Sequence, residues 1–178
     1  NNLVAMSANI FVIRHPESGM PKYIANNVSK DVHIINAGDG NNSHPTQGLL
    51  DAFTIRKYKK DFNGLKIAIV GDIKHSRVAR SEMHTLSILG VSEIRLVGPK
   101  IFMPDDIDQT KFQEFNDMKE GISDVDVVMM LRIQKERMQK KIIPSEKKYF
   151  ESFGLTTKLL KYAKKDAIVM HPGPINRG

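Results

Sequence analysis

The sequence contains no cysteine, no long apolar run and few aromatic residues. The absence of cysteine excludes disulfides, thiolate zinc sites and cysteine nucleophiles, and it fits the reducing cytoplasm, where we expect this protein to be located. No apolar run approaches the roughly 18 residues that a membrane helix requires. The first residues show no basic segment followed by a long apolar stretch, so we expect neither a signal peptide nor a membrane partner.

The basic charge and the scarcity of aromatic residues bear on nucleic-acid binding. The formal net charge is +7, and aromatic residues make up 7% of the chain. The lysines and arginines are spread along the sequence without any recognisable nucleic-acid-binding motif, so we expect no nucleic-acid partner. Inward-facing arginines that bind small anionic substrates explain the charge equally well.

Two cofactor signatures are also missing. Gly71 ends a predicted strand, but Asp72 follows it and no second glycine completes the GxGxxG pattern of dinucleotide-binding loops. The six histidines are scattered, with no HExxH motif and no pair at helical ligand spacing beside carboxylates. We therefore expect no metal and no cofactor.

Apolar segments alternate with helical patterns along the chain. Strands are predicted at residues 10–13, 32–36, 65–71, 93–98, 111–115, 124–131 and 166–170. Helices are predicted at residues 19–28, from Pro45 onward, at 76–89, from 104–109 onward, at 145–154 and at 156–165. Such alternation, with near-continuously apolar strands, indicates parallel sheets that are covered on both faces.

The expected fold class is therefore α/β, with two doubly wound parallel-sheet domains of which the first is only partly present. We place residues 1–46 at the end of the first domain and residues 47–178 in the second. Pro45 suits the first position of a helix, because its missing N–H costs nothing there. The apolar residues expected on one face of that helix are Leu49, Leu50, Phe53 and Tyr58.

Polar residues follow most of the predicted strands. In open parallel sheets, ligands bind at the carboxyl ends of the strands. This rule selects candidate positions at the ends of five strands. They are residues 14–16, 38–47, 72–77, 132–137 and 171–174.

Two of these positions offer arginines. Arg77 lies in the first turn of a predicted helix, where free N–H groups and a guanidinium can bind a carboxylate or a phosphate. Arg132 and Gln134 alternate, so in an extended segment both point to one side and can clasp a carboxylate. The structural alternatives are a solvent-exposed arginine and an ordinary basic loop.

Prolines mark the other candidate positions. Arg14 and His44 lie in the motifs RHP and HPTQ, where a proline fixes the local backbone. His44 and Gln47 are about one helical turn apart and can face one ligand, although a histidine at a helix N-cap is more often structural. Residues 171–174 place two prolines around a glycine, which predicts a rigid turn with free backbone carbonyls or simply a tight loop.

Five motifs occur in one order along the chain: RHP, NAGDGNNSHPTQ, GDIKHSRVARS, RIQKER and HPGPINRG. Together, and at these separations, they resemble the aspartate carbamoyltransferases. The resemblance implies a carbamoyl-phosphate domain and an aspartate domain in a homotrimer whose active sites are shared between subunits. It implies transfer of a carbamoyl group from carbamoyl phosphate to the amine of L-aspartate in pyrimidine biosynthesis, and regulatory or dihydroorotase chains as further partners.

The resemblance also implies roles for individual residues. A basic pair hydrogen-bonds the carbamoyl oxygen, an amide and two backbone carbonyls hold the carbamoyl NH2 group, and two arginines with a second amide bind aspartate. The residues implied for carbamoyl phosphate are Arg14, His44, Gln47, Pro172 and Gly173, and those implied for aspartate are Arg77, Arg132 and Gln134.

Some features of the family are missing from this sequence. The Ser-Thr-Arg-Thr motif that binds phosphate and the lysine loop from a neighbouring subunit would both precede Asn1, and the C-terminal helices would follow Gly178. The chain also begins without Met, on what looks like the end of a helix. We therefore expect a fragment of a longer chain, inactive alone.

Two alternatives remain open at this point. The ornithine carbamoyltransferases share the fold and an HPxQ-like motif. Resemblance to that family would imply a cysteine-containing loop where this chain has HPGP. The two arginines of RIQKER also favour a dicarboxylate acceptor. The second alternative is a non-catalytic homologue that serves as an assembly partner.

Overall fold

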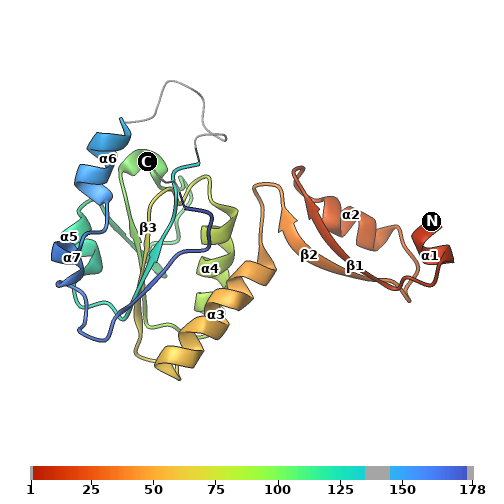
Figure 1. The fold of residues 1–178 in the computed structure, drawn as a ribbon, viewed down its shortest axis with the longest axis horizontal. Coiled ribbons are helices and arrows are strands. Elements are labelled where there is room, and N and C mark those ends of the chain that lie inside the picture. The colour runs from red at the N-terminus through yellow and green to blue at the C-terminus, as the bar shows by residue number, and fades with distance from the viewer. Residues whose placement is uncertain (1, 135–144, 176–178) are drawn as a thin grey trace.

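The computed structural model describes residues 2–134 and 145–175, which form a small N-terminal lobe and a larger lobe (Figure 1). The small lobe contains helix α1 (Asn2–Ala5), strand β1 (Ile10–His15), helix α2 (Met20–Asn26) and strand β2 (His33–Asp39). Strands β1 and β2 pair in parallel, with Ile10 opposite His33. Parallel neighbours require a crossover, and α2 provides it.

The larger lobe is built on a five-stranded sheet in the order β5-β4-β3-β6-β7. Its strands are β3 (Lys66–Val70), β4 (Glu93–Val97), β5 (Phe112–Phe115), β6 (Val127–Met130) and β7 (Ile168–Met170), and every pair is parallel. The chain builds outward from β3 through β4 to β5 and then returns to place β6 on the other side of β3. The carboxyl ends of β3 and β6 therefore form the switch point at which such sheets bind ligands.

Helices cover both faces of this sheet. Helices α3 (Pro45–Lys59) and α4 (Arg77–Ile88) lie on one face, and α5 (Met118–Ile122), α6 (Glu146–Phe153) and α7 (Thr157–Leu160) lie toward the other (Figure 1). A short 3-10 helix, η1 (Lys100–Phe102), follows β4. The expected α/β class with parallel sheets is confirmed.

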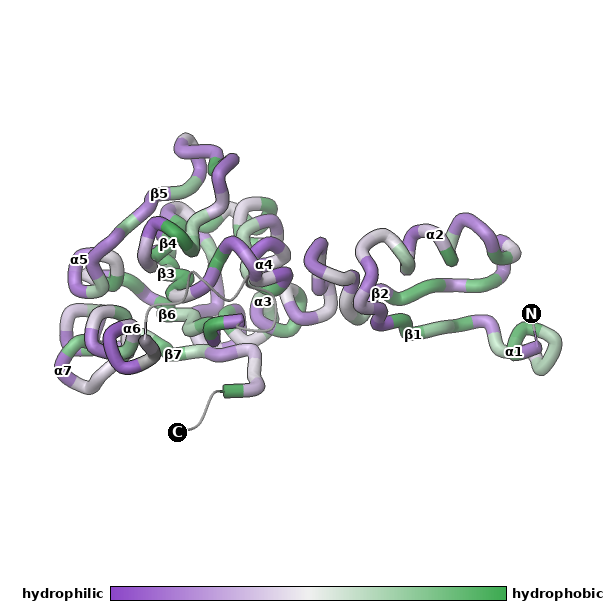
Figure 2. The backbone as a smooth tube through the Cα atoms, turned by 90° about the horizontal axis from the view of Figure 1, so that it is seen from above, coloured by the Kyte–Doolittle hydropathy of each residue, from purple (hydrophilic) through white to green (hydrophobic). Residues whose placement is uncertain are grey.

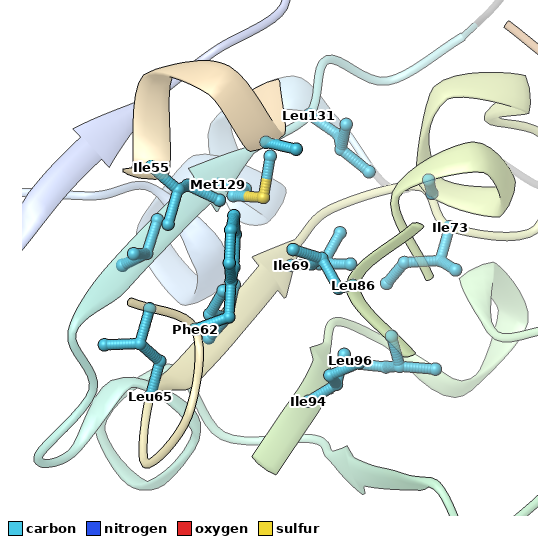
Figure 3. Close-up of a cluster of buried hydrophobic side chains, with 14 of the residues drawn as sticks. Ile55, Phe62, Leu65, Ile69, Ile73, Leu86, Ile94, Leu96, Met129 and Leu131 are labelled. Carbon is cyan, nitrogen blue, oxygen red and sulfur yellow. The ribbon is translucent and has the colours of Figure 1, made fainter. Parts of the chain in front are cut away.

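The side-chain alternation of β3 explains why both faces need cover. Ile67 and Ile69 point into one buried cluster, which also contains Ile55 of α3 and Leu86 of α4 (Figure 3). Ala68 and Val70 point into a second cluster, against α5 and α6. Apolar residues accordingly concentrate in the strands of this sheet (Figure 2). Burial of both faces is the main stabilising contribution to this lobe.

The structure corrects one predicted helix. No helix begins within residues 104–109, where the chain instead forms turns after η1. Acidic side chains bind neighbouring groups there: Asp108 accepts from the backbone N–H of Thr110, and Asp105 pairs with Lys74 at 2.7 Å. Such local side-chain bonds to the backbone compete with helix formation.

Helix α3 does not bury the apolar face that its sequence predicts. Leu49, Leu50, Phe53 and Tyr58 are each more than half exposed in the described structure. The residues that α3 buries are Gly48, Asp51, Ala52 and Ile55. None of the helices in residues 2–134 and 145–175 combines the length and apolar character needed to cross a membrane.

Candidate active site

A tight turn connects β2 to α3 and fixes the position of His44. The backbone N–H of Asp39 donates to the Ser43 carbonyl at 2.8 Å, and the N–H of Gly40 donates to the His15 carbonyl at 2.9 Å. His44 is the N-cap of α3, as predicted, and its backbone N–H donates to Ser81 Oγ of α4 at 2.8 Å. The junction between β2 and α3 is thereby attached to both lobes.

Two arginines meet at Gly38, near the end of β2. Arg77 is 7% exposed and donates from Nη1 to the Gly40 carbonyl at 3.1 Å. A Cβ atom added at Gly38 would lie 3.1 Å from the guanidinium carbon of Arg77 and 3.2 Å from Cγ of Arg14, and the φ of Gly38 is +140°. Only glycine suits this conformation and this close approach, so Gly38 leaves room for both arginines.

Burial and two nearby arginines act on the pKa of His44. Burial lowers the pKa of His44 from its ordinary value of 6.5, and the positive charges of Arg77 and Arg14 lower it further. Thr46 Oγ1 lies 3.3 Å from His44 Nδ1. A neutral imidazole presents one donor and one acceptor nitrogen, and a hydroxyl can bond to either of them because it both donates and accepts. The structure therefore brings together Arg14, His44 and Arg77.

Gln47 lies in the first turn of α3, and its side-chain amide nitrogen is hydrogen-bonded within the helix. Its Nε2 donates to both carboxylate oxygens of Asp51, at 3.1 and 3.2 Å. This is an i,i+4 pair on one face of the helix. Asp51 was not among the expected site residues, although its spacing from Gln47 was a usable signal.

A second group of polar residues lies at the carboxyl ends of β3 and β6. Asp72 is fully buried, lies 2.8 Å from His75 Nδ1, and accepts from the backbone N–H of Gln134 at 3.3 Å. Gln134 is 8% exposed, and its Oε1 is buried without a hydrogen-bond partner. Burial and the charge of Asp72 raise the pKa of Tyr149. Asp72 thus holds the segment after β6 against the end of β3.

Arg132 lies near the turn that follows β7. Burial and the charge of Arg132 lower the pKa of His171. The backbone N–H of Gly173 donates to His171 Nδ1 at 2.8 Å, and the Gly173–Pro174 peptide bond is cis. Pro172 is partly buried and Gly173 is exposed. Residues 135–137 of the expected Arg132–Arg137 segment lie outside the described residues.

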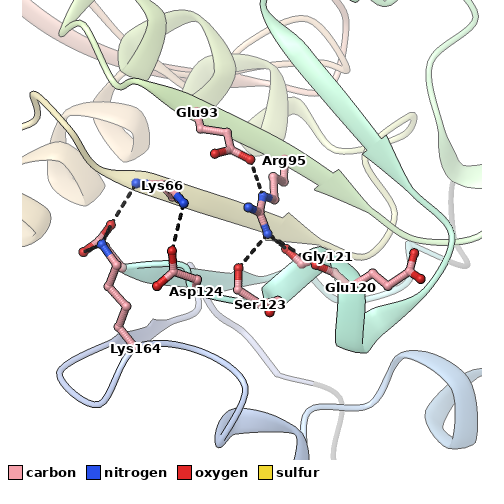
Figure 4. A network of polar contacts seen from close by, with 9 residues as sticks. Lys66, Glu93, Arg95, Glu120, Gly121, Ser123, Asp124 and Lys164 are labelled. Atoms are coloured by element: carbon pink, nitrogen blue, oxygen red, sulfur yellow. Dashed lines mark hydrogen bonds and ion pairs between the residues drawn. The ribbon is translucent and has the colours of Figure 1, made fainter.

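Another arginine network lies on the face of the sheet that α5 covers. Arg95 of β4 donates from Nε to Glu93 at 2.6 Å and from Nη1 to the carbonyls of Gly121 and Ser123, at 3.2 and 2.8 Å (Figure 4). Its guanidinium also lies over the ring of Phe115, at 5.2 Å. These contacts satisfy carbonyls at the C-terminal end of α5, so the role of Arg95 is structural.

Three cavities of the described structure lie away from the candidate site. A cavity of about 450 Å³ lies beside Arg95 and Lys119, and another lies among apolar residues of the small lobe. A third, of about 290 Å³, lies between α3 and α4. None of the three is lined by the candidate arginines, histidine or glutamines. The convergence of charged groups at strand ends is the stronger indication, because ligands of parallel sheets bind there.

Two family models match consecutive parts of the chain. The model described as the carbamoyl-P binding domain of aspartate/ornithine carbamoyltransferase matches residues 1–57. The model described as the Asp/Orn binding domain of aspartate/ornithine carbamoyltransferase matches residues 63–178.

Solved structures of aspartate transcarbamoylase from Trypanosoma cruzi share this fold. The complex with carbamoyl aspartate and phosphate has a TM-score of 0.84 and 28% identity, over 98% of this chain and 57% of that chain. The complex with carbamoyl phosphate has a TM-score of 0.84 and 28% identity, over 98% of this chain and 58% of that chain. The ligand-free form has a TM-score of 0.81 and 26% identity, over 98% and 58%.

This chain therefore spans less than two thirds of the length of these relatives. The model for the Asp/Orn binding domain alone covers more than half of this chain, and the model for the carbamoyl-P domain matches the part before it. The order of the two matches agrees with the order of the motifs in the sequence. The chain belongs to the aspartate/ornithine carbamoyltransferase family.

Proposed function

We propose that this chain is part of an enzyme that transfers the carbamoyl group of carbamoyl phosphate to the amine of L-aspartate, which gives N-carbamoyl-L-aspartate and phosphate. The observation that carries the proposal is the meeting of Arg14 and Arg77 at Gly38, with His44 close enough to both for their charges to lower its pKa. Two cations and a neutral imidazole at strand ends fit an anionic substrate with a polar carbonyl group. Membership of the family supports the same reaction.

Arg14 and His44 are proposed to stabilise the carbamoyl oxygen. The neutral amine of aspartate attacks the carbamoyl carbon, and negative charge grows on that oxygen. In the proposed tautomer, the imidazole proton lies on Nε2, which donates to the oxygen, while Nδ1 accepts from the Thr46 hydroxyl 3.3 Å away. The neighbouring arginines favour this neutral form of His44. Donors fixed in place before the reaction lower its barrier, because they need no reorganisation as charge develops.

Gln47 is proposed to bind the other side of the carbamoyl group. Its Nε2 is bonded to Asp51, so its Oε1 remains to accept a hydrogen bond from the carbamoyl NH2. Backbone carbonyls at Pro172 and Gly173 can accept from the same NH2 group. An oxygen-lined contact of this kind suits an NH2 donor and disfavours a carbonyl or carboxylate.

Arg77 and Arg132 are proposed to bind the two carboxylates of aspartate, with Gln134 assisting. A guanidinium has five N–H donors, and Nη1 of Arg77 binds the Gly40 carbonyl. Its planar fork meets a carboxylate through two bonds. The departing phosphate can accept the proton of the amine, so the reaction needs no covalent enzyme intermediate and no cofactor.

Ornithine is the second candidate acceptor, because the matched domain model is described for both acceptors. Ornithine carries a second amine where aspartate carries a second carboxylate. Arg132, whose charge reaches as far as His171, would repel that amine. Two arginines therefore favour aspartate.

The family resemblance also supports several broader parts of the proposal. They are a homotrimer with active sites shared between subunits, a role in pyrimidine biosynthesis, regulatory or dihydroorotase partner chains, and a cytoplasmic location. We further propose that residues 1–46 belong to the carbamoyl-phosphate domain and residues 47–178 to the aspartate domain.

An assay of the complete polypeptide that carries this sequence tests the proposal. Carbamoyl phosphate is supplied with aspartate or with ornithine, and the carbamoylated products are separated and quantified. We expect carbamoyl aspartate and no carbamoyl ornithine. Product from ornithine alone would identify the other acceptor, and no product from either would favour a non-catalytic assembly partner.

A further inference from the structure

Two carboxyl groups interact in the interior between α3 and α4, beneath the first turns of α3. Asp51 is 6% exposed and Glu82 is 1% exposed. The helices approach closely because α3 has a glycine at this point: a Cβ atom at Gly48 would lie 2.9 Å from Thr85 Oγ1 of α4. Acidic side chains are almost never buried without a partner, so this pair requires an explanation.

The pair is most stable when it holds one proton and one negative charge. Burial raises the pKa of both carboxyl groups, and the charge of Asp51 raises that of Glu82 further. With both groups ionised, neither oxygen of Glu82 has a hydrogen-bond partner. A proton on the more deeply buried Glu82 satisfies it, because the hydroxyl then donates to Asp51, and two adjacent carboxylates cannot both remain charged.

The charge on Asp51 determines which way the Gln47 amide points. A carboxylate accepts hydrogen bonds and cannot donate them, and Gln47 Nε2 lies 3.1 and 3.2 Å from its two oxygens. In the reversed orientation, Oε1 of Gln47 would face both carboxylate oxygens and repel them. Gln47 is therefore confined to the orientation in which Nε2 faces Asp51 and Oε1 remains to accept from a ligand.

We propose that Asp51, supported by Glu82, is a positioning residue that fixes the Gln47 amide, so that the site selects acyl phosphates with an NH2 group and discriminates against those without one. The inference rests on the proposed function, since it assumes that Gln47 contacts the carbamoyl group. The inference adds a cause for the selection of an NH2 group. That cause is a pair of residues between α3 and α4 that do not contact the substrate.

Acetyl phosphate is a suitable probe, because it has a methyl group where carbamoyl phosphate has NH2. Dissociation constants for both compounds are measured by calorimetry with the complete polypeptide. We expect the wild type to bind carbamoyl phosphate about tenfold more tightly, which corresponds to one hydrogen bond. In Asp51→Leu, which removes the acceptor at similar volume, carbamoyl phosphate should lose about tenfold in affinity while acetyl phosphate is unaffected.

Asp51→Asn is the conservative variant. Its Oδ1 can accept from Gln47 while its Nδ2 donates to Glu82, so we expect the preference for carbamoyl phosphate to be retained. Asp106→Asn changes an exposed carboxylate and is the charge control. If Asp51→Leu does not fold, Asp51→Ala takes its place, since the smaller side chain introduces no clash.

A double-mutant cycle with Gln47→Leu then shows whether Asp51 acts through Gln47. We expect the Asp51 substitution to have no further effect on the preference once Gln47 is removed. If Asp51→Leu, or Asp51→Ala in its place, weakens both compounds equally or keeps the wild-type preference, the inference is overturned and the transfer reaction is left intact. A wild type that binds neither compound would instead refute the proposed function and this inference with it.

Discussion

Replacing Arg77 by alanine perturbs the contact that attaches α4 to the end of the small lobe. Arg77 donates to the Gly40 carbonyl at 3.1 Å, lies against Gly38, and is 7% exposed. Its charge lowers the pKa of His44. Arg77→Ala therefore removes a buried hydrogen bond and, separately, a positive charge beside the imidazole.

The loss of stability follows from the hydrogen bond. A buried bond from a charged donor contributes about 1.5–3 kcal/mol, so the free energy of unfolding should fall by at least that amount. Arg80 lies one turn further along α4 and is exposed, and Arg80→Ala should change the same quantity by less than about 0.5 kcal/mol. Chemical denaturation of both variants, monitored by circular dichroism, measures the difference.

Removal of the Arg77 charge has a separate effect, which is seen in the pKa of His44 and in the pH dependence of folding stability. The pKa of His44 is lowered below 6.5 in the folded protein, so the unfolded chain binds more protons. Folding stability linked to His44 is therefore gained as pH rises through the folded pKa toward 6.5, and it is fully present above that value. Arg77→Ala should raise the pKa of His44 and reduce this pH dependence. Titration of the imidazole by NMR measures the shift directly.

Arg77→Lys separates the two effects. Lysine keeps the charge but loses the fixed planar fork, so the pKa of His44 should stay low while the bond to Gly40 weakens. An unchanged His44 pKa in Arg77→Ala would refute the arrangement, because it would mean that the guanidinium does not act on the imidazole. A raised pKa in Arg77→Lys, equal to that in Arg77→Ala, would equally contradict a role for the charge.

Two further predictions concern aspartate binding and pH. In the complete polypeptide, Arg132→Ala should weaken aspartate binding about tenfold or more and leave carbamoyl phosphate binding unchanged; equal loss of both in calorimetry would contradict its role. The free energy of unfolding of Glu82→Gln should increase relative to that of wild type as pH rises. The folded pKa of Glu82 lies well above 4.5, so wild-type stability falls as the unfolded chain ionises above that pH, whereas glutamine does not titrate. We measure the free energy of unfolding of both proteins by urea denaturation at pH 5 and pH 8. The value for the variant minus that for wild type should be more positive at pH 8, and the same value at both pH would argue against a protonated Glu82.

The central strands could be predicted closely because their burial leaves a strong pattern. Strand β3 was expected at residues 65–71 and spans Lys66–Val70, since both of its faces are apolar and Gly71 ends the run. Helix α5 was not predicted, although Asp117 caps it by accepting from the N–H of Glu120 at 2.8 Å. Its five residues are too few to show a helical period, and an Asp followed three residues later by Glu was the only available signal.

The site could be predicted in part from the rule that ligands bind at strand ends. That rule selected Arg14, His44 and Arg77, and the structure places the two arginines at Gly38 and His44 within reach of their charges. It did not select Asp51 or Glu82, because both lie inside helices. The spacing of Asp51 from Gln47 was a local signal, but the contact between Asp51 and Glu82 exists only after α3 packs against α4. Contacts of this kind depend on tertiary packing, and no local pattern in the sequence contains them.

The packing of α3 against α4 connects the two substrate sites that the proposed reaction requires. Helix α3 begins with His44 and Gln47, which are assigned to carbamoyl phosphate, and α4 begins with Arg77, which is assigned to aspartate. The bond from the His44 backbone to Ser81 and the buried contact between Asp51 and Glu82 fix one helix against the other. A shift of either helix would therefore change the distance between the two substrates. Because the rate of a two-substrate reaction depends steeply on that distance, substitutions in this interface should affect turnover more than they affect the binding of either substrate alone.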